Sequence, residues 1–283
     1  IGMEGYLAPR SMRDRDPQKD KRSTHLLLLA ENQTGYQNLL RIASASQLEG
    51  YYYRPRIDRD FLAEHADGLI VTSGCMSAEI PRAIQRGQMD SARRKLDWYF
   101  DVFGVDRFFL ELQEHNIEDL KRINKTLLEL GPHYNARFVA TNDVHYVNPQ
   151  DAYYQDMLLA IQTGKLFKDP DRMRMTSEDY YLRSPQEMQE IFGHVEGAID
   201  NTLWIAERCN VDLSFQEYHL PNYDVPDGKS ARSYLRELCE AGLNKRYGGR
   251  ARDPEIRSRL EYELNIIHEM GFDAYFLIVW DIC

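Results

Sequence analysis

The sequence predicts an α/β fold. Apolar segments of strand length recur in the first half of the chain, at residues 1–6, 25–30, 68–73, 107–113 and 137–142. Segments with apolar residues at helical spacing lie between several of them. Strands and helices that alternate at intervals of about 30–40 residues are typical of βαβ units, so we expect a parallel sheet or barrel surrounded by helices.

The helices between and after these strands can be placed in order. The first is predicted at residues 34–43, where Thr34 can cap the N-terminus. Two more, at 91–103 and 117–130, carry apolar residues three or four positions apart. After Asn148–Pro149 the predicted helices are 152–161, 184–192 and 195–210. The predicted α/β domain therefore extends to about residue 215.

A change in composition predicts a second domain. Residues 220–228 are rich in proline, asparagine, aspartate and glycine, which is typical of a linker. Charged helical segments follow at 230–247 and 253–270, and the apolar run Tyr275–Trp280 could begin a strand or a helix. We therefore predict two domains, at residues 1–215 and 216–283.

Composition narrows the class of protein. Of 283 residues, 43% are hydrophobic and 28% are charged, as in soluble globular proteins. No apolar run has the length of a membrane span and there is no signal-peptide pattern. The four cysteines are scattered, which favours a reducing, cytoplasmic location. A net charge of −10 argues against a non-specific nucleic-acid clamp.

Both ends of the sequence suggest that it continues. Ile1 lies within a predicted strand, and Cys283 follows an apolar run with no polar tail. We therefore expect an internal segment of a longer protein.

Metal-ligating side chains are predicted at the ends of several strands. Asp143 and His145 follow the last strand and lie two residues apart, so that on an extended segment they would point the same way. Glu4, His25 and Cys75 occupy the first, second and third strand segments or the residues just after them. Carboxylate, imidazole and thiolate together suit transition metals such as Zn, Mn or Fe.

Each of these residues also has a plainer interpretation. Glu4 could be an edge-strand charge, and His25 and Cys75 could be ordinary core residues. Glu111 could pair with an arginine, and His115 lies just beyond it. The other five histidines lie in polar contexts and are interpreted as surface residues: His65, His133, His194, His219 and His268.

Two segments are rich in arginine, and their compositions predict different roles. Residues 10–22 mix arginine and lysine with aspartate, which is typical of a solvated, mobile loop. Arg54 and Arg56, on either side of Pro55, could instead hold a phosphate near the strand ends.

A series of motifs resembles a known family over the whole chain. The motifs include Gly2-x-Glu4, Thr24-His-Leu-Leu-Leu-Leu-Ala30, Tyr53-x-Pro-Arg-Ile-Asp58, Ser73-Gly-Cys75, Ala140-Thr-Asn-Asp-Val-His-Tyr146 and Met270-Gly-Phe. This series is similar to the polymerase-and-histidinol-phosphatase (PHP) domain of bacterial replicative DNA polymerase III alpha subunits, continuing into the polymerase core.

The resemblance implies a fold and a metal site. The fold would be a distorted seven-stranded (β/α) barrel, truncated here at its N-terminus and followed by the mostly helical start of the polymerase palm region. The family binds up to three metals, and its matching ligands here are Glu4, His25, Cys75, Asp143 and His145. Its first His-x-His motif would lie upstream of Ile1. The Mg-binding carboxylates of the polymerase would lie beyond Cys283.

The resemblance also implies function and partners. The parent would be a DNA-directed DNA polymerase, a nucleotidyltransferase of chromosome replication, whose PHP domain could act as a 3′–5′ exonuclease. Its partners would be primer-template DNA, dNTPs, the sliding clamp, the clamp loader and a proofreading subunit, with no membrane. Two alternatives stay open: a non-catalytic platform that docks the proofreading subunit, and, less well supported, a free-standing phosphatase.

Overall fold

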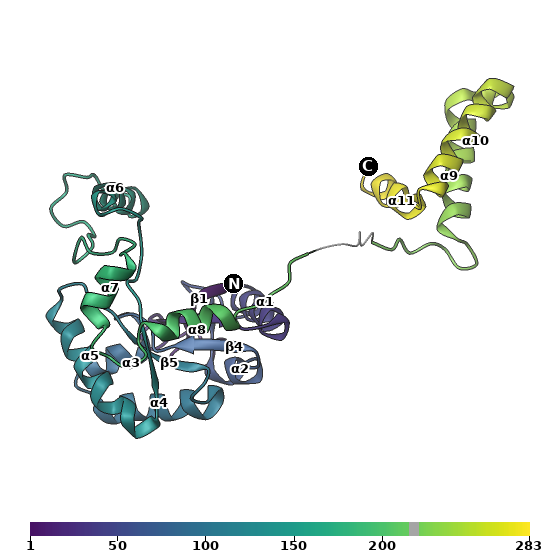
Figure 1. The fold of residues 1–283 in the computed structure, drawn as a ribbon. Coiled ribbons are helices and arrows are strands. Elements are labelled where there is room, and N and C mark those ends of the chain that lie inside the picture. The colour runs from purple at the N-terminus through teal and green to yellow at the C-terminus, as the bar shows by residue number, and fades with distance from the viewer. Residues whose placement is uncertain (215–220) are drawn as a thin grey trace. The chain divides into compact units, whose positions relative to one another are not determined.

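The computed structural model describes residues 1–214 and 221–283. Within it the chain forms two compact units, Ile1–Asp212 and Leu213–Cys283, which are drawn in Figure 1. The predicted domain boundary at 215, along with His219 and Leu220 from the predicted surface and linker residues, lies outside the described residues. None of the described helices has the length and apolar character that crossing a bilayer would need.

The first unit is built on a six-stranded mixed sheet with the order β3-β1-β2-β4-β5-β6. The strands are β1 (Gly2–Leu7), β2 (Thr24–Ala30), β3 (Arg56–Ile57), β4 (Leu69–Thr72), β5 (Phe108–Leu112) and β6 (Arg137–Ala140). All five predicted strands are present within two residues of their expected ends. The α/β class is confirmed, but the described strands form an open sheet and show no closed barrel.

One strand corrects the expectation of a parallel sheet. β2 pairs antiparallel with both β1 and β4, whereas the β1–β3, β4–β5 and β5–β6 pairs are parallel. The reason is the connection from β1 to β2, a loop without a crossover helix, because a parallel pair needs such a crossover. The first residues of β2 therefore lie at the sheet edge where the other strands end.

Helices cover both faces of this sheet. The helices of the first unit are α1 (Gln33–Leu48), α2 (Arg59–Glu64), α3 (Glu79–Gln85), α4 (Met89–Phe103), α5 (Glu118–Leu130), α6 (Ala152–Gln162), α7 (Pro185–Phe192) and α8 (Asp200–Arg208), of which α6 lies apart from the sheet (Figure 1). The larger core lies on one face and includes Leu26, Leu28 and Ala30 of β2. On the other face Ile205 of α8 packs against Ile70, Phe109 and Val139.

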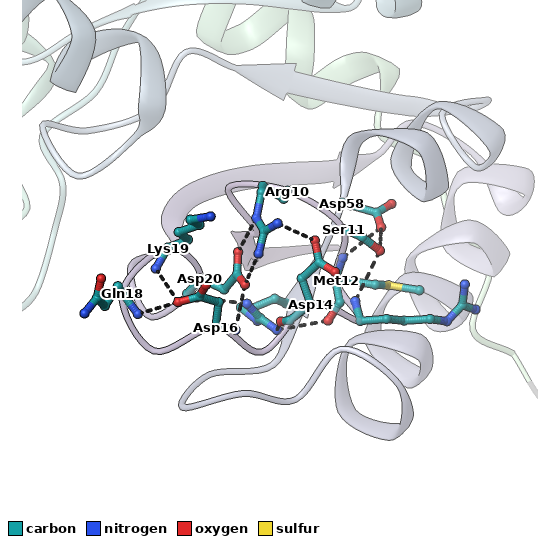
Figure 2. A network of polar contacts seen from close by, with 11 residues as sticks. Arg10, Ser11, Met12, Asp14, Asp16, Gln18, Lys19, Asp20 and Asp58 are labelled. Carbon is teal, nitrogen blue, oxygen red and sulfur yellow. Dashed lines mark hydrogen bonds and ion pairs between the residues drawn. The ribbon is translucent and has the colours of Figure 1, made fainter.

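The loop between β1 and β2 is held by a polar network (Figure 2). Asp20 is fully buried and accepts two hydrogen bonds from Arg10, at 2.9 and 2.6 Å, and one from the backbone N–H of Asp16. Asp58 accepts from the backbone N–H of Met12. Arg10, Asp14 and Asp20 therefore pair with one another, while most of the other residues of the loop are exposed, in line with the expected solvated loop.

The second unit is helical. It contains α9 (Ala231–Tyr247), α10 (Pro254–Glu269) and α11 (Asp273–Ile282) around a small core of Leu235, Leu264 and Leu277. The apolar run Tyr275–Trp280 lies in α11, so the helical alternative for that run is the observed one. Residues 221–228 form no helix or strand.

Candidate metal centre

Three of the five predicted ligands meet at the sheet edge where β2 begins. In the β1–β2 ladder Glu4 pairs with Leu27 and Tyr6 pairs with His25, so the Glu4 and His25 side chains lie diagonally on one face. Cys75 lies three residues beyond β4, the other neighbour of β2. The reversed direction of β2 thus brings its first residues to the edge where β4 ends.

His25 contacts both of the other residues. Its Nδ1 lies 2.6 Å from Oε1 of Glu4 and 3.8 Å from Sγ of Cys75. Contacts with Cys75 and with Glu4 raise the pKa of His25 to about 9. The same hydrogen bond from His25 lowers the pKa of Glu4. A carboxylate and a thiol therefore both approach one nitrogen of the His25 imidazole.

Asp143 and His145 form a second group, on the loop after β6. Asp143 has a φ of +43°, an uncommon backbone conformation for a residue other than glycine. The backbone N–H of His145 donates to the carbonyl of Tyr180 at 2.8 Å. The His145 ring nitrogen Nδ1 lies 2.6 Å from the Asp143 carbonyl. These contacts fix the turn that carries both side chains.

The two groups interact electrostatically without touching. Burial raises the pKa of Asp143, and the negative charges of Glu111 and Glu4 raise it further against the opposite effects of His145 and His25. Among the described residues no hydrogen bond or ion pair joins Asp143 or His145 to Glu4, His25 or Cys75. A buried carboxylate whose pKa is raised by the charges of neighbouring carboxylates lies where a cation would be stabilised.

His115 borders the same site, and no role was assigned to it from the sequence. It is 2% exposed, and neither ring nitrogen makes a well-formed hydrogen bond in the described structure, although the backbone of Asp179 is close enough to act on its pKa. Its ring stacks on Tyr180 at 4.1 Å between centroids, and Tyr180 also contacts His145 edge-on at 5.4 Å. Burial, then the charge of Arg183, lowers the pKa of His115 to about 4. The signal available in the sequence was its position, just beyond the strand that carries Glu111.

Glu111 does not pair with an arginine, as one interpretation of the sequence suggested, but accepts hydrogen bonds from neutral side chains. Its carboxylate is 6% exposed and accepts from the Thr72 hydroxyl at 2.5 Å, the Thr141 hydroxyl at 2.5 Å and the Gln113 amide at 2.8 Å. No ion pair to Glu111 occurs in the described ranges. Glu111 therefore ties β4, β5 and β6 together beneath the site.

The candidate ligands have the donor atoms that a transition metal prefers, but they are not positioned around one point. Glu4, His25, Cys75, Asp143 and His145 supply oxygen, nitrogen and sulfur donors, and His115 adds an imidazole with no well-formed hydrogen bond in the described structure. Across the described residues, however, no three His, Cys, Asp or Glu side chains are placed to hold one ion. The arrangement gathers the ligands at one sheet edge without forming a coordination sphere.

The two arginines predicted to hold phosphate differ in their surroundings. Arg56 is fully buried, and its guanidinium donates to the carbonyls of Gly50, Asp20, Met12 and Asp14 at 2.9–3.1 Å. These bonds leave it no access to a phosphate, so the structure argues against that role for Arg56. Arg54 is exposed and lies over the ring of Tyr6 at 5.4 Å.

Four of the histidines interpreted as surface residues lie within the described part of the chain. His133 and His194 are exposed. His65 is half-buried and stacks on Phe61, and His268 of the second unit contacts Asp273. None of the three described in the first unit has a recorded contact with a predicted ligand.

Comparison with known proteins identifies both units. Residues 1–115 match the family model of the PHP domain, and residues 233–283 match that of the bacterial DNA polymerase III alpha NTPase domain. The chain is 40% identical to DNA polymerase III subunit alpha of Treponema pallidum (strain Nichols), over 99% of this chain and 24% of the relative. It is 41% identical to that subunit of Borreliella burgdorferi over 99% and 24%, and 38% identical to that of Thermus aquaticus over 99% and 28%.

The mixed sheet, the ligand-bearing edge and the first match define a PHP domain within the first unit. The chain as a whole belongs to the DNA polymerase III alpha subunit family. It spans about a quarter of the length of the curated relatives that it matches.

Proposed function

We propose that the chain is a segment of a replicative DNA polymerase, with residues 1–215 forming a PHP phosphodiesterase domain and residues 216–283 forming a linker and the beginning of the polymerase core. The parent protein would extend a primer on template DNA from dNTPs, in the cytoplasm, together with clamp, clamp-loader and proofreading subunits. Similarity along nearly the whole chain to polymerase III alpha subunits supports this assignment.

Within this protein the PHP domain would act as a metal-dependent 3′–5′ exonuclease. The observation that carries the proposal is the convergence of Glu4 and Cys75 on one nitrogen of His25, beside Asp143. Asp143, His145 and the buried His115 would complete the ligand set, and strands upstream of Ile1 would close the sheet into the seven-stranded barrel. When bound, Zn, Mn or Fe would supply Lewis-acid polarisation of a phosphate oxygen and an acidic bound water.

The residues of this chain contribute position and charge. Glu4 orients the imidazole of His25, and the backbone bonds of the Asp143–His145 turn aim that pair at the same edge. Glu111, fully hydrogen-bonded, keeps three strand ends together beneath the site. The Mg needed for nucleotide addition would be held outside this chain.

Substitutions in the full-length subunit test the exonuclease. Asp143→Asn and His145→Ala should each abolish hydrolysis of a 3′-labelled single strand and lower the metal content measured by elemental analysis. Nucleotide incorporation should stay near the wild-type rate, because it uses another site. Asp101→Asn, at an exposed position on α4, is the matched control and should change neither activity.

A non-catalytic platform is the competing function, and one observation favours it: in the described residues no three donors are placed to hold an ion. On that reading the wild-type subunit would contain no stoichiometric metal, and Asp143→Asn would leave any hydrolysis unchanged. A parallel loss of hydrolysis and incorporation would instead show a metal that only supports folding.

A further inference from the structure

A basic hollow of about 550 Å³ adjoins the candidate metal centre. Its lining includes five cations, Lys21, Arg22, Arg54, Arg82 and Arg86, and the aromatic ring of Tyr53. His25, the residue that contacts Glu4 and Cys75, lies in the same wall. No described carboxylate lines this hollow, in a chain with 45 acidic and 35 basic residues.

The five cations have no acidic partner among the described residues. Arg82 donates to the carbonyl of Ser23 at 3.0 Å, Arg54 lies over the ring of Tyr6 and Lys21 lies over the ring of Tyr53. Burial, then the charge of Arg86 with that of Arg22, lowers the pKa of Arg82. Cations that repel one another in a hollow without acids create a positive field that an anion would relieve.

Tyr53 is presented to this hollow as an exposed aromatic surface. It is 55% exposed although its ring is large and apolar, and its φ of +60° is uncommon for a bulky residue. Its ring packs edge-on against Tyr52 at 4.6 Å, and Tyr52 lies against the buried Arg56 guanidinium. Strained positions of this kind persist where the surroundings fix them, and they cluster at ligand sites.

The hollow continues beyond the space that one phosphate would fill. Arg22, Arg82 and Arg86 also line a second hollow of about 650 Å³. Four more cations line this second hollow, together with three carboxylates, of which Glu79 is paired with Arg59 and Lys95: Arg10, Lys19, Arg59 and Lys95 against Asp58, Asp60 and Glu79. The cations that line both hollows form a continuous basic track. Such a track is better matched to a chain of linked phosphates than to a single phosphate group. Basic grooves with aromatic platforms bind single strands by contacts to the backbone and by stacking of bases.

We propose that Lys21, Arg22, Arg54, Arg82 and Arg86 bind the phosphodiester backbone of a single-stranded nucleic acid, with a base stacked on Tyr53, and lead that strand to His25. The inference rests on the proposed exonuclease for its purpose, since it names where the substrate strand lies. The binding itself needs no metal. Arg56 stabilises the track indirectly, by holding the Gly50 carbonyl and the β1–β2 loop.

Binding of a fluorescent ten-nucleotide thymidine strand to the 283-residue chain, in EDTA, tests the proposal. Arg54→Ala combined with Arg86→Ala should weaken binding about tenfold or more and reduce the slope of log K against log salt by about one unit or more. Arg94→Ala combined with Arg93→Ala removes the same charge from exposed positions on α4 outside both hollows, and should change binding less than about twofold.

Tyr53 has its own matched pair of variants. Tyr53→Ala should weaken binding about fivefold or more, because stacking on an aromatic ring contributes about 1–3 kcal/mol per base. Tyr53→Phe, which keeps the ring, should bind like the wild type. Equal affinity of Tyr53→Ala and wild type would overturn the stacking role.

Competition identifies the ligand. Unlabelled strand should displace the probe, whereas inorganic phosphate and thymidine monophosphate at the same phosphate concentration should not. Displacement by the monophosphate, or equal loss of binding in the Arg93 and Arg94 variant, would overturn the strand track. Failure of the exonuclease is separate, because it appears as unchanged hydrolysis in Asp143→Asn while strand binding in EDTA still depends on Arg54 and Arg86.

Discussion

In the loop between β1 and β2, Arg10 forms ion pairs with Asp14 and Asp20. The adjoining basic hollow, to which the same loop contributes Lys21 and Arg22, is lined by five cations that have no acidic partner among the described residues. Asp20 of the loop is fully buried and pairs with the exposed Arg10, and Arg86 of the hollow is exposed with no ion pair in the described structure. Arg54 and Arg56, two positions apart, fall on opposite sides of this division. The comparison shows two classes of charged side chain at this edge of the sheet. Paired charges stabilise the fold, whereas unpaired charges are available to bind a ligand.

Among these predictions, removal of the Arg56 guanidinium should lower the free energy of unfolding the most. Arg56→Ala would leave four carbonyls of buried or partly buried backbone without their donor, at about 1–3 kcal/mol each when unsatisfied. We expect the free energy of unfolding in urea to fall by at least about 3 kcal/mol. Arg54→Ala, the matched control, should change it by less than about 0.5 kcal/mol. Similar losses in both variants would erase the distinction.

Acid should reduce the stability that the paired carboxylate of Glu79 contributes. Glu79 lies in the same hollow as two of the unpaired arginines, Arg82 and Arg86. Glu79 is 9% exposed and accepts from Arg59 at 2.6 and 2.7 Å and from Lys95. Burial raises its pKa, but the contacts with Arg59 and Lys95 outweigh burial and hold the pKa below its usual value. Its stabilising effect is therefore complete above the unfolded pKa of about 4.3 and is lost as pH falls through the lower folded pKa.

Glu79→Gln tests this pH dependence. The variant should unfold about 1–3 kcal/mol more easily than wild type at pH 7, and the difference should shrink as the pH falls below about 4. Urea unfolding at several pH values measures both effects. Glu64→Gln, at an exposed position on α2, should follow the wild type throughout. A difference that grows in acid would contradict the assigned sign.

Loss of an unpaired cation should change the free energy of unfolding the least. Arg86→Gln removes a charge that repels Arg82 and makes no described ion pair. We expect the free energy of unfolding to stay within about 0.5 kcal/mol of wild type or to rise slightly. Thermal and urea unfolding measure it, and a loss above about 1 kcal/mol would place Arg86 among the paired, structural charges.

Periodicity predicted the main strands because each buries alternate or continuous apolar side chains. It missed β3, since two residues, Arg56 and Ile57, are too few to show a pattern. The sequence also gave no sign that β2 runs against its neighbours, because strand direction depends on the path of the connecting loop. The linear pattern shows which residues are apolar, and the connections decide how the strands are assembled.

The candidate site was predictable at the level of residue type and strand position. Glu4, His25, Cys75, Asp143 and His145 remain predictions as metal ligands, and the structure brings the first three together. The burial of Arg56 was not predictable, since an arginine beside proline is usually exposed, and three of the four bonds that hold it go to residues more than 30 positions away. Long-range contacts of this kind leave no local signature.

The antiparallel strand β2 has a consequence for how this site tolerates insertion. Its buried residues alternate, Leu26, Leu28 and Ala30, so a slip of one position against β1 would expose all three and turn His25 toward the core. The alignment is thus set by the strand itself and not by the length of the loop before it. Residues could be added to that loop at a modest entropic cost, provided that the bonds of Asp20 and Arg56 stay intact, while His25 keeps its place opposite Tyr6.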